Sequence, residues 1–154
     1  MLPGDLEDAK ELFTDEDAQR FYIRGVLCEP DVGSYVRRLI DKEEREGFGV
    51  WPAIEKSSRE LIGAAGISRV AELGGDVEID WIFKPAARGK GYAKEAAAAV
   101  LEYAFGAAQL RRVCALIDPG NSPSITIANR LGMRFDRVVR AYKRDLMRYV
   151  KEKP

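Results

Sequence analysis

One segment of this sequence combines two glycines with two basic side chains, between an apolar run and an alanine-rich run. It reads Arg88-Gly89-Lys90-Gly91-Tyr92-Ala93, with the apolar run at 77–83 and the alanine-rich run at 94–108. Glycine lets a backbone come close to a ligand, and the first amides of a helix lack partners and lie at the positive end of its dipole. The segment therefore predicts a strand-to-helix turn that binds an anion, most often a phosphate group.

Three kinds of phosphate loop compete for this segment. A P-loop needs four residues between its glycines and a Lys-Ser/Thr pair after the second, and the segment has neither. A dinucleotide fingerprint needs a third glycine within a βαβ unit, whereas the preceding runs resemble an antiparallel meander. The third kind, a coenzyme A pyrophosphate loop, fits the pattern Arg-x-x-Gly-x-Ala followed by a helix.

Two carboxylates precede the loop, two positions apart. Glu78 and Asp80 fall on one face of an expected strand, whereas Ile79, Trp81 and Phe83 fall on the other. The sequence contains no histidine, which excludes Ser-His and Cys-His nucleophiles and histidine-based metal sites. A general base here must be a carboxylate, although a solvated polar face or ion pairs with arginines would also explain both residues.

Composition limits the class of protein. The 154 residues fit a single domain, residues 1–154, and Lys plus Arg equal Asp plus Glu at 25 each, so we expect no nucleic-acid partner. No apolar run is long enough for a membrane span and no signal-peptide pattern is present, so we expect a cytoplasmic protein without a membrane partner. Cys28 and Cys114 make neither a disulfide framework nor a metal site; Cys114 is expected in the core and the role of Cys28 is open.

Hydrophobic spacing and turn residues outline the elements. Helices are expected over 5–13, 14–21, 31–46, 94–108 and from about 122 to 131, with Ser122 or Ser124 as the N-cap of the last. Strands are expected over 48–55, 61–70, 77–83, 112–117, 133–138 and 140–149. This order predicts an α/β (α+β) sandwich rather than a regular βαβ repeat.

Several segments resemble the GNAT N-acetyltransferase superfamily. The glycine loop matches that family's acetyl-CoA signature, and residues 77–85 resemble its fourth strand. Asp-Pro-Gly-Asn-Ser-Pro-Ser at 118–124 and Ala-Asn-Arg-Leu-Gly-Met at 128–133 resemble the second cofactor segment of its ribosomal-protein N-terminal acetyltransferase subgroup. The resemblance covers about residues 5 to 149 and implies the GNAT fold, with a mixed, mostly antiparallel central sheet flanked by helices.

The resemblance also implies how acetyl-CoA would bind. The pyrophosphate would meet the backbone amides of Gly89, Lys90, Gly91, Tyr92 and Ala93, with Arg88 either on the phosphate or capping the turn. Ile82 and Phe83 would offer backbone groups to the pantetheine arm, which lies in a split between neighbouring strands. Asn121 would bond the same arm and Ser124 would protonate the departing thiolate, unless both only cap a helix. Ala128 stands where many members carry a tyrosine acid, and Tyr142 is a distant alternative.

On the acceptor side, Glu78 matches a glutamate common in the subgroup and is the expected base. Asp80 replaces what is often a glycine. Phe21, Tyr22 and Tyr35 fall where the family builds its acceptor pocket, whereas the basic residues from 134 to 148 are expected on a solvated sheet face.

One departure from the family concerns the beginning of the chain. Residues 2–5 resemble the end of the first strand of the family, so that strand is expected to be missing. Either the recorded start is internal to a longer reading frame, or the protein lacks the strand. In the second case the strand at 48–55 would be a sheet edge, which a homodimer partner could cover.

The predicted function is transfer of an acetyl group from acetyl-CoA to a primary amine, either a protein N-terminus or a small molecule. Transfer would occur directly in a ternary complex, because no activated nucleophile is evident. The alternative is a non-catalytic acyl-CoA-binding module of the same fold.

Overall fold

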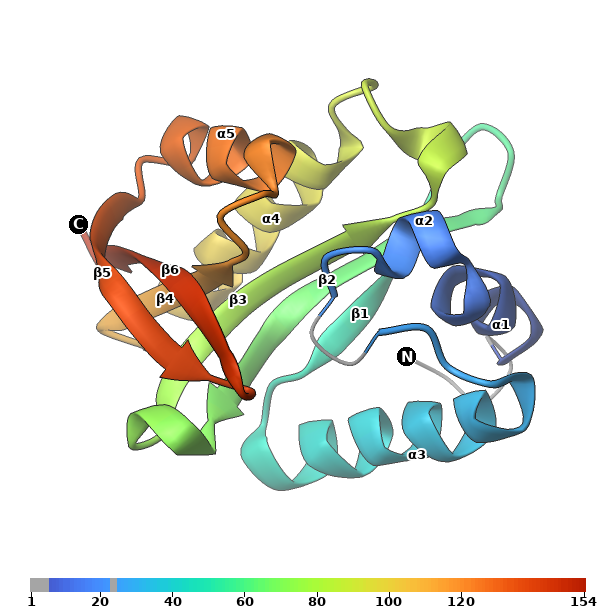
Figure 1. The fold of residues 1–154 in the computed structure, drawn as a ribbon, viewed down its shortest axis with the longest axis horizontal. Coiled ribbons are helices and arrows are strands. Elements are labelled where there is room, and N and C mark those ends of the chain that lie inside the picture. Colours follow the sequence, from blue (N-terminus) through green and yellow to red (C-terminus); the bar gives the residue numbers. More distant parts are fainter. Residues whose placement is uncertain (1–5, 23–24) are drawn as a thin grey trace.

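The computed structural model describes residues 6–22 and 25–154, in which a six-stranded sheet lies between two layers of helices (Figure 1). The strands are β1 (Val50–Ile54), β2 (Leu61–Val70), β3 (Asp76–Phe83), β4 (Arg112–Ile117), β5 (Arg134–Ala141) and β6 (Arg144–Glu152). The helices are α1 (Leu6–Thr14), α2 (Glu16–Gln19), α3 (Glu29–Glu46), α4 (Tyr92–Phe105) and α5 (Ser122–Arg130). The strand order is β1-β2-β3-β4-β6-β5, and every neighbouring pair is antiparallel except β3 with β4. This confirms the predicted mixed, mostly antiparallel sheet.

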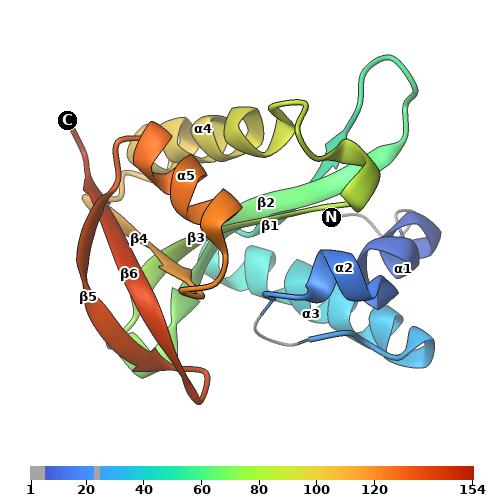
Figure 2. The ribbon, with the colours of Figure 1, turned by 45° about the horizontal axis from the view of Figure 1, so that its top comes forward.

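The two helical layers bury opposite faces of the sheet (Figure 2). Helices α4 and α5 cover one face, and α1, α2 and α3 cover the other. The first face packs on the apolar side chains of α4, such as Val100 and Leu101, together with Ile79 and Val113 of the sheet. The second packs on Leu12 and Val36. The sheet thus separates two sides of the molecule, and a site between β3 and β4 can be reached from both.

The parallel strands β3 and β4 pair at one position and are separated beyond it. Glu78 pairs with Cys114, and no further register pair joins these two strands among the described residues. By contrast, β2 and β3 pair continuously from Gly63↔Phe83 to Val70↔Asp76. The later residues of β3 therefore have a strand neighbour on one side only, which matches the expected split between neighbouring strands.

The last hairpin differs from the prediction. The closing strands were expected over 133–138 and 140–149, but β5 continues to Ala141 and the turn falls at Tyr142 and Lys143. Both turn residues have left-handed backbone, with φ of 51° and 62°. Neither is a glycine or asparagine, so the sequence carries no ordinary turn signal there. Tyr142 consequently lies in a turn and not on a strand.

Strand β1 forms one edge of the described sheet, as predicted. The segment 2–5, where the end of an earlier strand was expected, lies outside the described residues. Within the described part of the chain, no helix is both long and apolar enough to cross a bilayer.

Candidate active site

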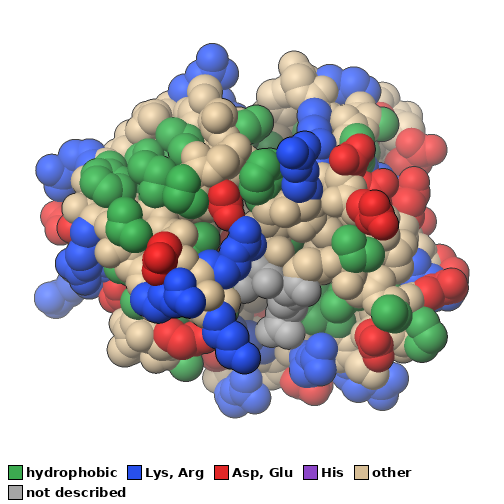
Figure 3. Space-filling view, in the orientation of Figure 1, with side chains coloured by type: hydrophobic (Ala, Val, Ile, Leu, Met, Phe, Trp, Pro, Cys, Tyr) green, Lys and Arg blue, Asp and Glu red, His purple; other side chains and the backbone are tan. Residues whose placement is uncertain are grey.

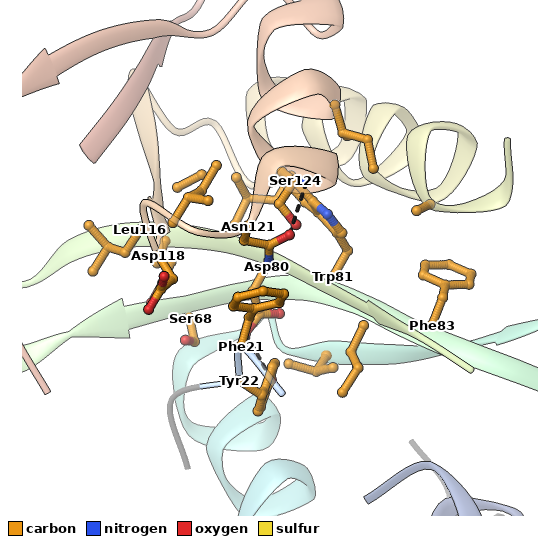
Figure 4. A pocket seen from close by; sticks show the side chains of 18 of the residues that line it. Phe21, Tyr22, Ser68, Asp80, Trp81, Phe83, Leu116, Asp118, Asn121 and Ser124 are labelled. Atoms are coloured by element: carbon orange, nitrogen blue, oxygen red, sulfur yellow. Dashed lines mark hydrogen bonds between the residues drawn. The ribbon is translucent and has the colours of Figure 1, made fainter. Parts of the chain in front are cut away.

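A cavity of about 730 Å³ opens at the split between β3 and β4. Its lining comes from both sides of the sheet. Figure 4 shows Phe21 and Tyr22 on one side of β3, and Asn121 and Ser124 on the other. The predicted residues Glu78, Asp80, Ile82, Phe83, Arg88 and Ala93 also line it. The structure therefore brings the ends of the glycine loop, the segment after β4 and the expected acceptor residues to one cavity, whereas Gly89, Lys90, Gly91 and Tyr92 are not among the residues that line it.

The glycine loop has the backbone that its sequence predicted. Gly89 and Gly91 have φ of 75° and 87°, in the left-handed region that side chains other than glycine rarely adopt. Gly91 is the N-cap of α4, and a Cβ built on either glycine meets no atom within 4 Å. The loop amides at the start of α4 therefore border open space at the positive end of the helix dipole.

Three side chains of the loop point in different directions. Arg88 donates through Nη2 to the carbonyl oxygen of Asp17 at 2.7 Å, which ties the loop to α2. Tyr92 donates its hydroxyl to Glu55 in the turn after β1, and this bond, together with the charge of Lys90, lowers the pKa of the Glu55 carboxyl. Lys90 itself is exposed. Tyr92 and Arg88 thus hold the loop from two sides, a role that the sequence did not indicate.

The segment after β4 corrects one prediction. The N-cap of α5 is Asn121, whose side-chain oxygen accepts from the Ser124 backbone amide at 3.2 Å; neither Ser122 nor Ser124 is the cap (Figure 4). Asparagine is as good a cap as serine, so the residue type alone left the choice open. Asn121 and Ser124 both line the cavity.

Glu78 is a buried carboxyl group at the point where β3 and β4 still pair. Its residue is 4% exposed, Tyr142 donates to its Oε2 at 2.9 Å, and the Leu116 backbone also hydrogen-bonds the carboxyl. Burial and then the negative charge of Asp80 raise the pKa of Glu78 to about 8, against the opposing effect of these bonds. A carboxyl group with this pKa is suited to accept a proton near neutral pH.

Asp80 lies on the same face of β3, as predicted, and has a tyrosine partner of its own. Tyr22 donates its hydroxyl to Asp80 Oδ2 at 3.1 Å. Burial raises the pKa of Asp80 to about 6, whereas the bond from Tyr22 acts in the opposite direction. Glu78 is thus buried, Asp80 is half-buried, and both are hydrogen-bonded to tyrosines, so the solvated-face and arginine-pair interpretations do not describe them.

Sequence reasoning missed the partners of these carboxyls. Tyr22 and Tyr142 lie 58 and 64 positions from Asp80 and Glu78, so no local spacing connects them. Tyr22 and Tyr35 were expected to shape an acceptor pocket, and both line the cavity. Trp81 extends toward the first turn of α5 (Figure 4), and its buried indole N–H has no hydrogen-bond partner among the described residues.

The basic residues of β5 and β6 also differ from the prediction of a solvated face. Arg148 is buried and donates to both Asp76 and Asp136, and Arg144 donates to Asp118 at 2.5 Å. A buried guanidinium needs such partners, because an uncompensated charge is costly away from water. Arg148 therefore belongs to an internal ion network, whereas Arg134 and Arg137 are exposed as expected.

Comparisons with known proteins agree with this geometry. The acetyltransferase (GNAT) domain family matches residues 1–134. Two Bacillus subtilis proteins are similar over most of the chain: uncharacterized protein YkkB, 34% identical over 87% of each chain, and uncharacterized N-acetyltransferase YnaD, 33% identical over 84% of this chain and 74% of its own. A GNAT-family acetyltransferase structure from Bacillus anthracis superposes with a TM-score of 0.83 at 26% identity, covering 99% of this chain and 92% of the other. The chain therefore belongs to the GNAT acetyltransferase family and is an acetyl-CoA-dependent acyltransferase.

Proposed function

We propose that this protein transfers an acetyl group from acetyl-CoA to a primary amine, directly and within a ternary complex. The observation that carries the proposal is the position of Glu78. It is a buried carboxyl group with a pKa raised to about 8, in the cavity that Arg88 and Ala93 of the glycine loop also line. An aliphatic amine is protonated near neutral pH and must lose a proton before it attacks a carbonyl group.

The residues present fit acetyl-CoA. Left-handed Gly89 and Gly91 leave open space at the loop amides, which would hold the pyrophosphate. The later part of β3 lacks a partner on the β4 side, so backbone groups at Ile82 and Phe83 would bond the pantetheine arm, as would the Asn121 side chain. Bound there, acetyl-CoA supplies an acetyl group activated as a thioester.

Glu78 would take the proton from the amine. Tyr142 and the Leu116 backbone fix its carboxyl group, so that it does not have to reorganise when its charge changes. The proton for the departing thiolate would come from Ser124, which lines the cavity in the first turn of α5. The new N–C bond replaces the C–S bond. Of the two protons that the ammonium loses on becoming an amide, one would pass to Glu78 before the attack, and the other would pass by way of the Ser124 hydroxyl to the sulfur, which leaves Ser124 as a hydroxyl again.

The acceptor would enter from the side of α1, α2 and α3. Phe21, Tyr22 and Tyr35 line the cavity there, on the face of β3 that carries the carboxyls. A protein N-terminus and a small-molecule amine both present the required primary amine. Assays of acetyl transfer to each kind of acceptor distinguish them.

The first experiment is a thermal-shift titration with CoA and acetyl-CoA on the wild type, Gly91→Trp and Gly74→Trp. A ligand that binds only the folded protein raises its melting temperature. Gly74 is a matched control, because it also has left-handed backbone, at φ 67°, with no atom within 4 Å of a built Cβ, but lies outside the glycine loop. We expect acetyl-CoA to stabilise the wild type and Gly74→Trp but not Gly91→Trp.

Release of the CoA thiol is then measured with an alanine-initiated peptide, spermidine and kanamycin as acceptors. We expect turnover with at least one of them and its loss in Glu78→Gln. Stabilisation by acetyl-CoA without turnover on any amine would contradict the proposal and favour a non-catalytic acyl-CoA-binding module.

A further inference from the structure

The two carboxyls of β3 form a matched pair. Each has one oxygen held by a tyrosine hydroxyl, Oε2 of Glu78 by Tyr142 at 2.9 Å and Oδ2 of Asp80 by Tyr22 at 3.1 Å. The tyrosines come from different parts of the fold, one from the β5–β6 turn and the other from the segment after α2, and both line the cavity. Both carboxyls are therefore fixed in orientation, and each keeps acceptor capacity on its second oxygen.

Alternate residues of a strand lie about 6–7 Å apart along it. A single ammonium group donates several hydrogen bonds of about 2.8 Å in different directions, so one group between the two side chains reaches both. The pair is thus spaced for one cation.

The charges around the two carboxyls also indicate a site for a cation. Lys42 of α3 is the cation that acts electrostatically on both carboxyls, and its Nζ donates to the Arg69 carbonyl oxygen at 3.3 Å. Tyr22 and Tyr142, the two hydroxyls that hold the carboxyls, are neutral, because burial raises the pKa of each. When both carboxyls are ionised, their two negative charges exceed the one positive charge by which Lys42 acts on both, which favours a cationic ligand beside the pair.

We propose that Asp80 binds the acceptor as its ammonium ion and presents it to Glu78, which takes the proton. This inference rests on the proposed function and names the acceptor class: an aliphatic amine that is protonated in solution. One N–H proton moves from the bound ammonium to the Glu78 carboxylate, and the nitrogen lone pair it leaves becomes the nucleophile. Asp80 keeps its charge throughout and holds the nitrogen next to the base.

An arylamine of the same size lacks the charge that this pair recognises. Its nitrogen is neutral at neutral pH, so it gains nothing from Asp80 and leaves the two carboxyls facing each other. Tyr22 and Tyr35 would accommodate either ring. Discrimination between the two amines therefore reports on Asp80 and not on cavity shape.

The test compares cyclohexylamine, a cation at neutral pH, with aniline, a neutral amine of similar size. Binding of each to CoA-saturated protein is measured by calorimetric titration in the wild type, Asp80→Asn, Tyr22→Phe and Asp118→Asn. Asp118 is the matched control, because it also lines the cavity but is paired with Arg144. We expect Asp80→Asn to weaken cyclohexylamine at least tenfold and leave aniline unchanged, Tyr22→Phe to act in the same direction, and Asp118→Asn to preserve the preference.

The acid limb of kcat/KM against pH provides a second readout. Asp80→Asn removes a negative neighbour that raises the pKa of Glu78, so the limb moves to lower pH. A role of Asp80 in packing alone, in which its charge has no part, would not move the limb.

The outcomes separate this inference from the proposed function. The role of Asp80 would be overturned if Asp80→Asn weakened the binding of both amines equally or weakened neither. It would also be overturned if the wild type bound aniline more tightly than cyclohexylamine. Asp80-dependent binding of cyclohexylamine without acetylation of any amine would support the ammonium site and overturn the proposed acetyl transfer. Acetyl-CoA stabilisation of each variant shows that it has folded.

Discussion

At the scale of single residues, the assignment of the base rests on Glu78 being the buried acid that a hydroxyl and a backbone group hold in place. Replacing it with glutamine keeps an oxygen for the Tyr142 hydroxyl but removes the proton acceptor. We expect kcat/KM to fall by about a hundredfold or more in Glu78→Gln, the usual contribution of a general base. Steady-state kinetics with the best acceptor of the screen measure this. An unchanged affinity for acetyl-CoA is the control, and a variant that keeps its activity would exclude Glu78 as the base.

Tyr142 has two roles to distinguish, as a support for Glu78 and as a proton donor for the thiolate. Its hydrogen bond lowers the pKa of Glu78, so Tyr142→Phe should raise that pKa and move the acid limb of kcat/KM to higher pH. If Tyr142 only supports Glu78, Tyr142→Phe keeps kcat/KM near the wild-type value on the alkaline plateau. A proton donor would instead lower the rate at every pH, which is the effect we expect for Ser124→Ala. A pH–rate profile of the two variants side by side decides between them.

At the scale of elements, the glycine loop depends on the backbone conformation of Gly91 at the start of α4. Alanine there has space for its Cβ, so its cost comes from the left-handed φ and amounts to about 1 kcal/mol. Gly74→Ala carries the same backbone cost outside the loop. We expect equal loss of stability in both variants by urea unfolding, but weaker acetyl-CoA binding in Gly91→Ala alone. Equal acetyl-CoA affinities in the two variants would mean that the loop amides do not hold the ligand.

The elements themselves were largely predictable from the sequence. Strand β2 and strand β4 have the predicted bounds, because clear turn residues flank them, and α3 ends at the predicted Glu46, with Gly47 as its C-cap. The predicted position of the last turn was wrong, because Tyr142 and Lys143, two residues without turn propensity, adopt positive φ there. Within the site, the glycine loop and the shared face of Glu78 and Asp80 follow from local spacing. The bonds from Tyr22 and Tyr142 do not, since they join residues that only the folded sheet brings together.

At the scale of the whole molecule, the glycine loop and the tyrosine that contacts Asp80 lie on different sides of the sheet. The glycine loop leads into α4 on one face of the sheet (Figure 2), and Tyr22, which contacts Asp80, lies on the opposite side of β3 from Asn121 and Ser124 (Figure 4). Figure 3 shows basic and acidic side chains interspersed over the surface in that view, without a field of one sign. We therefore expect local groups within the cavity, more than the charge of this face of the surface, to decide which acceptor binds.

The two carboxyls of β3 also set how the stability of the molecule depends on pH. Folding raises the pKa of Glu78 from 4.5 to about 8 and that of Asp80 from 3.8 to about 6. A group with a raised pKa in the folded state contributes stability below its unfolded pKa, and this contribution is lost as the pH rises through its folded pKa. The free energy of unfolding should therefore decline from about pH 5 to about pH 8, by a few kcal/mol at the most.

Few other groups act in this window, because the sequence contains no histidine. Asp76 and Glu55 have lowered pKa values, so their contributions are already complete above about pH 5. We therefore expect urea unfolding of the wild type to show the decline, Glu55→Gln to retain it, and Glu78→Gln to lose most of it and to exceed the wild type in stability at pH 8. A wild-type stability that stays constant or rises across this range would show that the carboxyls of β3 remain as accessible to water as those of the unfolded chain, and would remove the basis for Glu78 as a base of raised pKa.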